Sequence, residues 1–194
     1  TDKNLLISSS TASGKTEAAF FPVISLLASD PPTSFGVLYI APLKSLINDQ
    51  FSRLDEVLDQ SGIPVFHWHG DVAMSHKNKA LRNPQGILQI TPESLESMLM
   101  NRSNDIVRLF GDLRFIILDE IHILTGTDRG NQMICQLCRI SRLIGHAPVR
   151  IGLSATLGDP ERAAAWLGGG SNRKTSIVGT RQGKASFRLG MEHF

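Results

Sequence analysis

The chain has 194 residues, of which 41% are hydrophobic and 20% charged, so it is long enough for one full hydrophobic core but not comfortably for two. Its net charge of +2 is too small to indicate nucleic-acid binding from bulk electrostatics alone. The longest apolar stretch, residues 18–28, is interrupted by Pro22 and Ser25 and is shorter than the ~20 residues that a membrane-spanning helix needs, which argues against a membrane partner.

The first predicted unit is a strand, a tight loop and a helix. The apolar run Leu5-Leu6-Ile7 leads into Ser-Ser-Thr-Ala-Ser-Gly-Lys-Thr at residues 9–16, and a helix is expected from there to about residue 28. Pro22 is expected to bend this helix because it removes one backbone hydrogen bond. A loop that ends at a helix start directs backbone N–H groups at one point, where the helix adds partial positive charge. The sequence therefore predicts a phosphate-binding loop that includes Thr11, Ala12, Ser13, Gly14, Lys15 and Thr16.

The residue types at the end of this loop predict a nucleoside triphosphate with magnesium. Lys15 is expected to reach the β- and γ-phosphates, and the Thr16 hydroxyl to bind Mg²⁺. Gly14 stands where the backbone must come close to phosphate. The usual pattern, G-x-x-x-x-G-K-[ST], has its first glycine where this chain has Ser9, so a Gly-Lys-Thr turn that only begins a helix remains the alternative.

After this unit, strands and helices alternate along the chain. Strands are expected at residues 35–41, 64–69, 87–90, 114–120 and 149–153. Helices are expected from the turn at 42–45 to about 60, and at 72–82, 93–100, 131–144 and 160–167, with a further helix or turn at 104–110. This order predicts an α/β fold with a mostly parallel central sheet and helices on both faces. Ligands of such sheets bind at the carboxyl ends of the strands.

Two adjacent carboxylates, Asp119 and Glu120, follow the apolar run at residues 115–118. This layout is typical of a buried strand that delivers acid groups to its carboxyl end. In a P-loop NTPase the first acid, Asp119, would hold Mg²⁺ together with Thr16, and Glu120 would polarise the attacking water. We therefore expect the lysine loop and the two acids to lie at the same edge of the sheet. An acidic turn after an edge strand is the alternative.

Six segments together resemble superfamily 2 helicases of the DEAD/DEAH-box group, most closely the Lhr-type (large helicase-related) subgroup. They are residues 9–16, like motif I; Ala-Pro-Leu-Lys-Ser-Leu-Ile-Asn-Asp-Gln at 41–50, like motif Ia; Thr-Pro-Glu-Ser-Leu-Glu at 91–96, like motif Ib; Asp-Glu-Ile-His at 119–122, like motif II; Ser-Ala-Thr at 154–156, like motif III; and Ala-Ala-Trp-Leu-Gly-Gly at 164–169. The last resembles the end of the first helicase domain in Lhr-type proteins. The resemblance implies a RecA-like P-loop NTPase domain that uses ATP and Mg²⁺.

Roles for further residues follow from the resemblance only. Coupling between the nucleotide site and the nucleic-acid face is implied for His122, Ser154, Ala155 and Thr156. Contact with the backbone of single-stranded DNA or RNA is implied for Pro42, Lys44, Gln50, Thr91, Pro92, Glu93 and Arg129. Helix N-termini and basic side chains suit such contacts because they offer donors to phosphate without reading bases.

The chain also departs from the family pattern. Ser9 and Ala12 replace the more usual small residue and glycine of motif I. An adenine-reading Q motif before residue 5 is absent from these residues, as are motifs IV to VI, which such enzymes carry on a second RecA-like domain. We expect residues 1–170 to form the first RecA-like domain and residues 171–194 to be a linker with a strand that leads to the second.

Two smaller patterns have structural interpretations. Cys135 and Cys138 lie in an apolar helix pattern without a second pair, so buried packing is expected rather than metal binding. They are the chain's two cysteines, which fits a reducing, cytoplasmic compartment. His67 and His69 alternate along a strand and share one face; without a visible third ligand they are expected to be structural or strand-end polar residues.

The function predicted from the sequence is the ATP-binding half of an ATP-dependent helicase or translocase. Two alternatives stay open: a P-loop nucleotide switch that is not a motor, and a nucleic-acid-dependent ATPase module in a larger defence or repair protein. A second RecA-like domain with an arginine-rich motif would favour the motor, whereas a nuclease domain in the same product would favour the defence protein.

Overall fold

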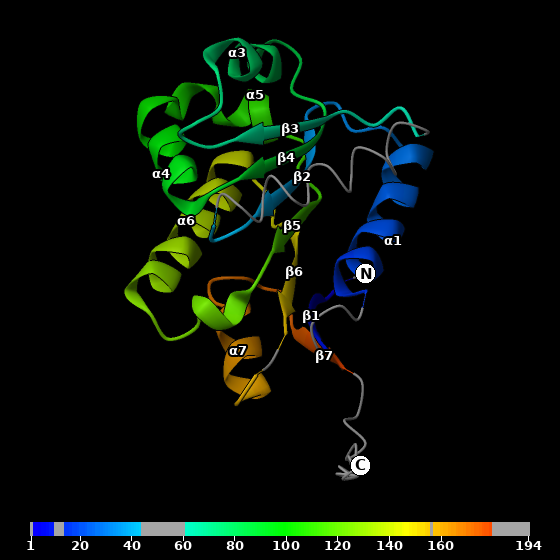
Figure 1. The fold of residues 1–194 in the computed structure, drawn as a ribbon, viewed down its shortest axis with the longest axis vertical. Coiled ribbons are helices and arrows are strands. Elements are labelled where there is room, and N and C mark those ends of the chain that lie inside the picture. The colour runs from blue at the N-terminus through cyan, green and yellow to red at the C-terminus, as the bar shows by residue number, and fades with distance from the viewer. Residues whose placement is uncertain (1, 10–13, 44–60, 156, 180–194) are drawn as a thin grey trace, which may run out of the picture.

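The computed structural model describes residues 2–9, 14–43, 61–155 and 157–179. They form one parallel sheet with helices on both faces, as the sequence predicts (Figure 1). The helix expected to end near residue 60 lies outside the described residues.

The sheet consists of seven strands in the order β3-β4-β2-β5-β6-β1-β7. Their bounds are Asn4–Ser8 (β1), Phe35–Ile40 (β2), Val65–Trp68 (β3), Gly86–Ile90 (β4), Phe115–Leu118 (β5), Val149–Ser154 (β6) and Thr175–Gly179 (β7). Every residue of β2, β4 and β6 is buried, as expected for strands that are covered on both faces.

The helices connect successive strands. Their bounds are Lys15–Ser29 (α1), Met74–Arg82 (α3), Pro92–Asn101 (α4), Ile106–Phe110 (α5), Asp128–Ile144 (α6) and Pro160–Leu167 (α7), with short 3₁₀ turns at Ser103–Asp105 (η1) and Ile121–Ile123 (η2). In the described part of the chain no helix is both long and apolar enough to cross a membrane.

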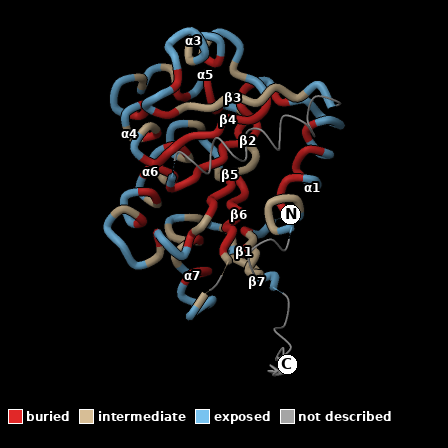
Figure 2. The backbone as a smooth tube through the Cα atoms, viewed as in Figure 1, coloured by how far each residue is buried: buried red, intermediate tan, exposed pale blue. Residues whose placement is uncertain are grey.

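The two faces of the sheet bury separate apolar clusters. On one face, the buried side of α1 packs on alternate residues of the central strands, among them Val37, Tyr39 and Ile117. On the other face, α3, α4, α5, α6 and α7 cover the intervening residues, such as Leu38 and Ile116. Figure 2 shows these buried positions running along the sheet and the inner sides of the helices. The α-helical layers on both sides leave the carboxyl edge of the sheet to the connecting loops.

Two segments differ from the sequence prediction. Helix α6 begins at Asp128, three residues earlier than predicted, because the Thr127 hydroxyl caps it by accepting from Gly130 N at 3.0 Å. Arg129 therefore lies in the first helical turn and not in a loop. At the other end, β7 pairs in parallel with β1 from Asn4↔Thr175 to Ser8↔Gly179, so the sheet continues beyond the predicted domain end at residue 170.

A charged clasp joins the start of β5 to the segment before β2. The Asp112 carboxylate accepts from Thr33 N at 2.9 Å and from Arg114 Nε at 2.9 Å. Arg114 Nη1 also donates to Asp30 O at 2.7 Å. The hydrogen bond from Arg114 is the main cause that lowers the pKa of Asp112 below its ordinary value of 3.8.

Replacing Asp112 with Ala is expected to lower the free energy of unfolding by about 1 kcal/mol at pH 7, since the clasp is partly exposed to solvent. A carboxyl with a lowered folded pKa stabilises the fold above its unfolded pKa, and this contribution is lost as the pH falls through the folded pKa. Urea unfolding at pH 7, 5 and 3 should therefore show a constant difference between wild type and variant down to about pH 5 and a smaller one at pH 3. A difference that grows at pH 3 would contradict this account.

Asp105→Ala is the matched control. Asp105 makes exposed i,i+3 ion pairs with Arg102 and Arg108, whose contribution is expected to be a few tenths of a kcal/mol at any of these pH values.

Candidate functional site

The predicted phosphate loop connects β1 to α1. Gly14 precedes the first turn of α1 with φ of 75°, a left-handed conformation that glycine adopts without strain. Lys15 Nζ donates to Ser9 O at 2.8 Å, so the ammonium reaches back to the other end of the loop. The basic group is thereby held next to the residue that follows β1, at the N-terminus of a helix of 15 residues.

Six of the predicted site residues cannot be placed. Thr11, Ala12 and Ser13 in the phosphate loop, Lys44 and Gln50 in the segment like motif Ia, and Thr156 lie outside the described residues.

The first acid, Asp119, lies directly after β5 and is 6% exposed. Its backbone N–H donates to Ile40 O at 2.9 Å and so extends the pairing with β2 by one residue. Its Oδ2 accepts from the Tyr39 hydroxyl, and its Oδ1 accepts from Glu120 N at 2.9 Å. Tyr39 lies opposite Ile117 in the sheet. Asp119 follows Ile117 by two positions, so its side chain lies on the same face of the sheet as Tyr39 and α1.

The second acid, Glu120, has φ of 47° and is the one non-glycine residue with positive φ in the described ranges. This conformation is uncommon for a residue with a side chain and is held where the surrounding structure enforces it. His122 Nδ1 lies 3.1 Å from Glu120 Oε2, a contact that is not aligned as a hydrogen bond. The same ring nitrogen lies 3.4 Å from Ser154 Oγ.

The lysine loop and the acids lie at the same edge of the sheet, with one strand between them. β6 separates β1 from β5, and its last residue, Ser154, contacts both neighbours: Ser9 N donates to Ser154 O at 3.2 Å, and His122 approaches the Ser154 side chain. Contacts thus run from Lys15 through Ser9, Ser154 and His122 to Glu120. The half-buried Ala155 follows directly.

A second group of predicted residues meets at the N-termini of α4 and α6. Arg129 Nη2 donates to Pro42 O at 2.8 Å, and Arg129 Nε donates to Glu93 Oε1 at 2.8 Å. Arg129 thereby ties the segment after β2 to the start of α4. Thr91 is 5% exposed and caps α4, since its hydroxyl accepts from Ser94 N at 3.3 Å. Pro92 is buried at the first helical position.

A hollow of about 470 Å³ lies beside this group, lined by Pro42, Leu43, Gly70, Thr91, Glu93, Ser94 and Ser97. No role is predicted from the sequence for Gly70, Ser94 or Ser97. Gly70 could have been found, because it follows the carboxyl end of β3 at the same edge as the other loops. Tyr39 could not, because its hydroxyl reaches Asp119 only through the register of β2 with β5.

The structure agrees with the predicted arrangement of the two strand histidines but not with the predicted burial of both cysteines. The rings of His67 and His69 stack with centroids 5.8 Å apart, as alternation on one face predicts. The described residues contain no group of three or more His, Cys, Asp or Glu side chains that could hold a metal ion. Cys138 is half-buried, but the expected burial of Cys135 is wrong. Cys135 is two residues beyond the buried Met133, which turns it to the outer side of α6.

Comparison with known proteins gives a family match over most of the chain. The family model described as DEAD/DEAH box helicase matches residues 1–163. The chain is 34% identical over 190 residues to the Lhr helicase/probable uracil glycosylase of Mycolicibacterium smegmatis, covering 90% of this chain and 12% of that protein. It is 36% identical over 195 residues to the ATP-dependent helicase Lhr-Core of Methanothermobacter thermautotrophicus, covering 91% of this chain and 22% of that protein.

Solved structures agree with this match. The structure of Mycobacterium smegmatis helicase Lhr bound to ssDNA and AMP-PNP has a TM-score of 0.78 at 34% identity, covering 91% of this chain and 24% of that one. DUF1998 helicase MrfA bound to DNA has a TM-score of 0.79 at 29% identity, covering 91% of this chain and 25% of that one. The chain thus spans at most about a quarter of these relatives. It belongs to the DEAD/DEAH-box helicase family, has the family's RecA-like fold, and counts Lhr-type helicases among its relatives.

Proposed function

We propose that this chain is the ATP-binding half of an ATP-dependent helicase or translocase that couples ATP hydrolysis to movement along a nucleic-acid strand. The observation that supports this most is the unbroken series of contacts from Lys15 through Ser9, Ser154 and His122 to Glu120. A change at the phosphate loop can reach the second acid through the backbone and side chains of these few residues, and the 3₁₀ turn of His122 leads directly toward α6 and Arg129.

In this proposal ATP lies at the carboxyl edge of the sheet, with its phosphates on the residue 11–16 loop. Lys15 offsets the charge of the β- and γ-phosphates, and Thr16 and Asp119 hold Mg²⁺. The donor set fits this ion, since Mg²⁺ prefers hard oxygen ligands and is usually held through one or two carboxylates. When bound, Mg²⁺ would neutralise charge on the phosphates. Tyr39 orients the Asp119 carboxylate, and Glu120 positions and polarises the attacking water.

The nucleic-acid strand is proposed to lie over the hollow at the N-terminus of α4. Two observations support this: Arg129 joins Pro42 to Glu93 at one rim, and α4 begins there, so the partial positive charge of its N-terminus lies beside the hollow. Structural neighbours with ssDNA or DNA bound come from the same family. Lys44, Gln50 and Thr156 are proposed to contribute to the same face or to its coupling.

A second RecA-like domain is proposed as the partner that completes the catalytic site. The segment after β7 is proposed to lead toward it, with the first domain of residues 1–170 extended by the strand β7. Motifs IV to VI of the family, absent from the 194 residues, would come from that domain and supply an arginine finger to the phosphates.

Lys15→Ala is expected to weaken binding of ATP with Mg²⁺ by at least about tenfold, because it removes the one side chain that the loop directs at the β- and γ-phosphates. Equilibrium titration of the 194-residue chain with a fluorescent ATP analogue measures this effect. Lys79→Ala removes an exposed lysine on α3 and serves as the control, with unchanged affinity expected. Equal ATP affinity of wild type and Lys15→Ala would refute the proposed nucleotide site.

A further inference from the structure

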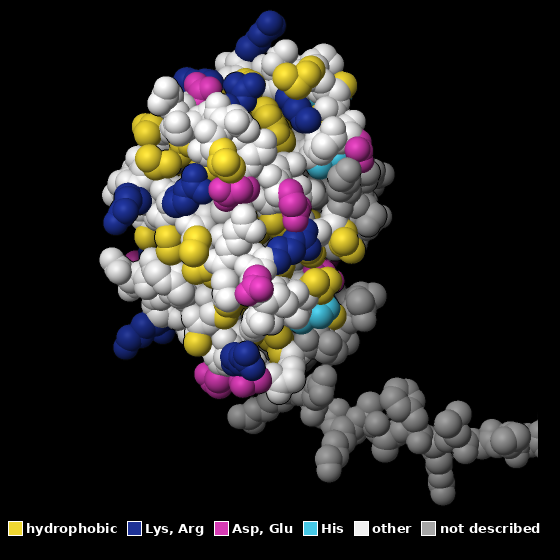
Figure 3. Space-filling view, turned by 90° about the vertical axis from the view of Figure 1, so that its left-hand side faces the viewer, with side chains coloured by type: hydrophobic (Ala, Val, Ile, Leu, Met, Phe, Trp, Pro, Cys, Tyr) yellow, Lys and Arg dark blue, Asp and Glu magenta, His cyan; other side chains and the backbone are white. Residues whose placement is uncertain are grey.

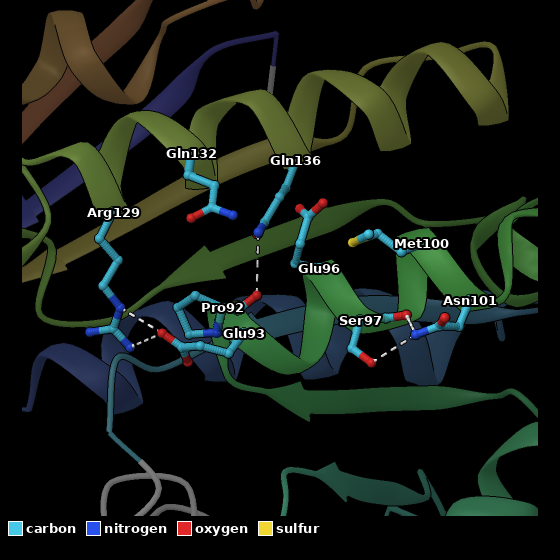
Figure 4. Close-up of a pocket in the computed structure, with 9 residues that line it drawn as sticks. All are labelled: Pro92, Glu93, Glu96, Ser97, Met100, Asn101, Arg129, Gln132 and Gln136. Atoms are coloured by element: carbon cyan, nitrogen blue, oxygen red, sulfur yellow. Dashed lines mark hydrogen bonds and ion pairs between the residues drawn. The ribbon is translucent and has the colours of Figure 1, made fainter.

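A groove of about 360 Å³ lies between α4 and α6 on the outer face of the domain (Figure 4). The two helices run side by side, and their N-termini meet where Arg129 contacts Glu93. Pro92 and Met100 of α4 and Gln136 of α6 line it. This volume lies at the low end of the range for small-ligand pockets, which suits a single compact group.

Gln136 lines this groove and holds a buried hydrogen-bond acceptor in a fixed orientation. The residue is 2% exposed, and its Nε2 donates to Pro92 O at 3.3 Å, which sets the orientation of the amide. Its Oε1 is buried and has no hydrogen-bond partner within the described part of the chain. A buried acceptor without a partner is costly and rare in folded proteins. The site therefore suits a ligand that brings an N–H or O–H donor.

The charges around the groove are already paired. Glu93 lies 2.7 Å from Arg129, and Glu96 lies 2.7 Å from Arg139. Figure 3 shows acidic and basic side chains interspersed with hydrophobic ones over this face. A groove without excess charge favours a neutral group over a phosphate or an ammonium ion.

Apolar surface complements the acceptor. Pro92 is buried beneath the groove, and Met100 is 69% exposed, an unusual exposure for a large apolar side chain. A thioether packs well against the edge or face of an aromatic ring. A planar, neutral, aromatic group with an amino donor satisfies the acceptor, the charge balance and the apolar surface together.

The groove is continuous with the proposed path of the nucleic-acid strand. Glu93 and Ser97 line both this groove and the 470 Å³ hollow beside Thr91, so only the first two turns of α4 separate the two. We propose that the groove receives one base of the bound strand and that the base's exocyclic amino group donates to Gln136 Oε1. This inference rests on the proposed function, since it assumes that a strand lies over the N-terminus of α4.

Adenine and cytosine carry such an amino group, whereas the one N–H on the pairing edge of thymine lies between two carbonyl oxygens. The 194-residue chain is therefore expected to bind oligo-dA about five- to tenfold more tightly than oligo-dT. This ratio lies in the lower part of the range of discrimination that one hydrogen-bonded base contact provides. Fluorescence anisotropy at fixed salt measures the two affinities, because binding to the phosphate backbone depends on salt.

Gln136→Met removes the amide and keeps a side chain of similar length. The variant is expected to bind oligo-dT as wild type does and to lose the preference for oligo-dA. Gln85→Met, in the exposed loop before β4, is the control and should keep the preference. Urea unfolding of Gln136→Met checks that the variant is folded. We expect that it is, because the substitution removes a buried acceptor that has no partner in the described part of the chain.

Peroxide oxidation of Met100 gives a readout that does not depend on affinity. Bound oligo-dA should slow formation of its sulfoxide more than saturating oligo-dT does, whereas Met74 on α3, 60% exposed, should show no such difference between the two strands. Equal protection of Met100 by both strands would overturn the base site.

The outcomes separate the two proposals. If neither oligonucleotide binds, strand binding itself is wrong. If both bind equally and Gln136→Met changes nothing, the base site is wrong while strand binding stands. If Met100 is protected without any oligonucleotide in a longer form of the protein, a polypeptide segment fills the groove, and the base site is again wrong.

Discussion

Replacing Glu120 with Gln is expected to lower ATP turnover by at least about 10²-fold while leaving ATP affinity within a few-fold of wild type. The variant keeps the size of the side chain and the αL backbone at this position, but removes the carboxylate that is proposed to polarise water. Turnover is measured with single-stranded DNA or RNA in the form of the protein that carries the second RecA-like domain. The 194-residue chain alone is expected to turn over very slowly, since an arginine finger contributes about 10³–10⁵ to the rate.

Glu161→Gln is the matched control for this variant. Glu161 is an exposed acid in the first turn of α7, outside both groups of site residues, so its loss should leave turnover unchanged. Normal turnover in Glu120→Gln would refute the role of Glu120. Normal nucleic-acid-stimulated turnover by the 194-residue chain alone would refute the need for the second domain.

Replacing Gly130 with Ala is expected to lower the free energy of unfolding by about 3 kcal/mol or more. A Cβ at this position would lie 1.9 Å from Leu124 O, a backbone atom that cannot rotate away. The same carbonyl accepts from Thr127 N at 3.1 Å and from the Thr127 hydroxyl at 2.8 Å, so the turn before α6 is tightly wound. Relief of the overlap must move α6 away from η2, which would displace His122 and Arg129 together.

Gly158→Ala tests whether this effect is specific to the position. Apart from its two neighbours in the chain, no atom of the described residues lies within 4 Å of a Cβ at Gly158, so a change of less than about 0.5 kcal/mol is expected. Urea unfolding of both variants measures the two effects. A Gly130→Ala variant as stable as wild type would mean that the turn is looser than described.

The sequence predicts the fold class and the motif positions well because both depend on local patterns. The alternation of strands and helices, the loop before Lys15 and the acids after β5 follow from apolar runs and breakers. The lateral order of the strands does not follow from such patterns, so the position of β6 between β1 and β5 was not predicted. A strand is predicted within the linker at residues 171–194, but the pairing of β7 with β1 does not follow from the local pattern.

Side-chain contacts between distant segments cannot be predicted from the sequence either, because local patterns do not determine which segments lie side by side. The resemblance implies that Arg129 contacts nucleic acid, but its bonds to Pro42 and Glu93 depend on how three loops converge. The buried, unpaired Gln136 Oε1 depends on the spacing of α4 and α6, which a helical pattern does not encode. Exposure of Cys135 could have been predicted from its position two residues after Met133.

The place of β1 in the sheet determines when it can be incorporated during synthesis. Among the described strands, β1 pairs with β6 and β7 alone, and Asn4 Oδ1 accepts from Arg150 N, 146 residues further along the chain. As the polypeptide leaves the ribosome, β2, β3, β4 and β5 can pair with one another, while β1, which is translated before them, still lacks both of the strands with which it pairs. The strand that leads to Lys15 is thus made before β2 to β5 and docks after them, so a nascent chain stopped before β6 lacks the strands with which β1 pairs.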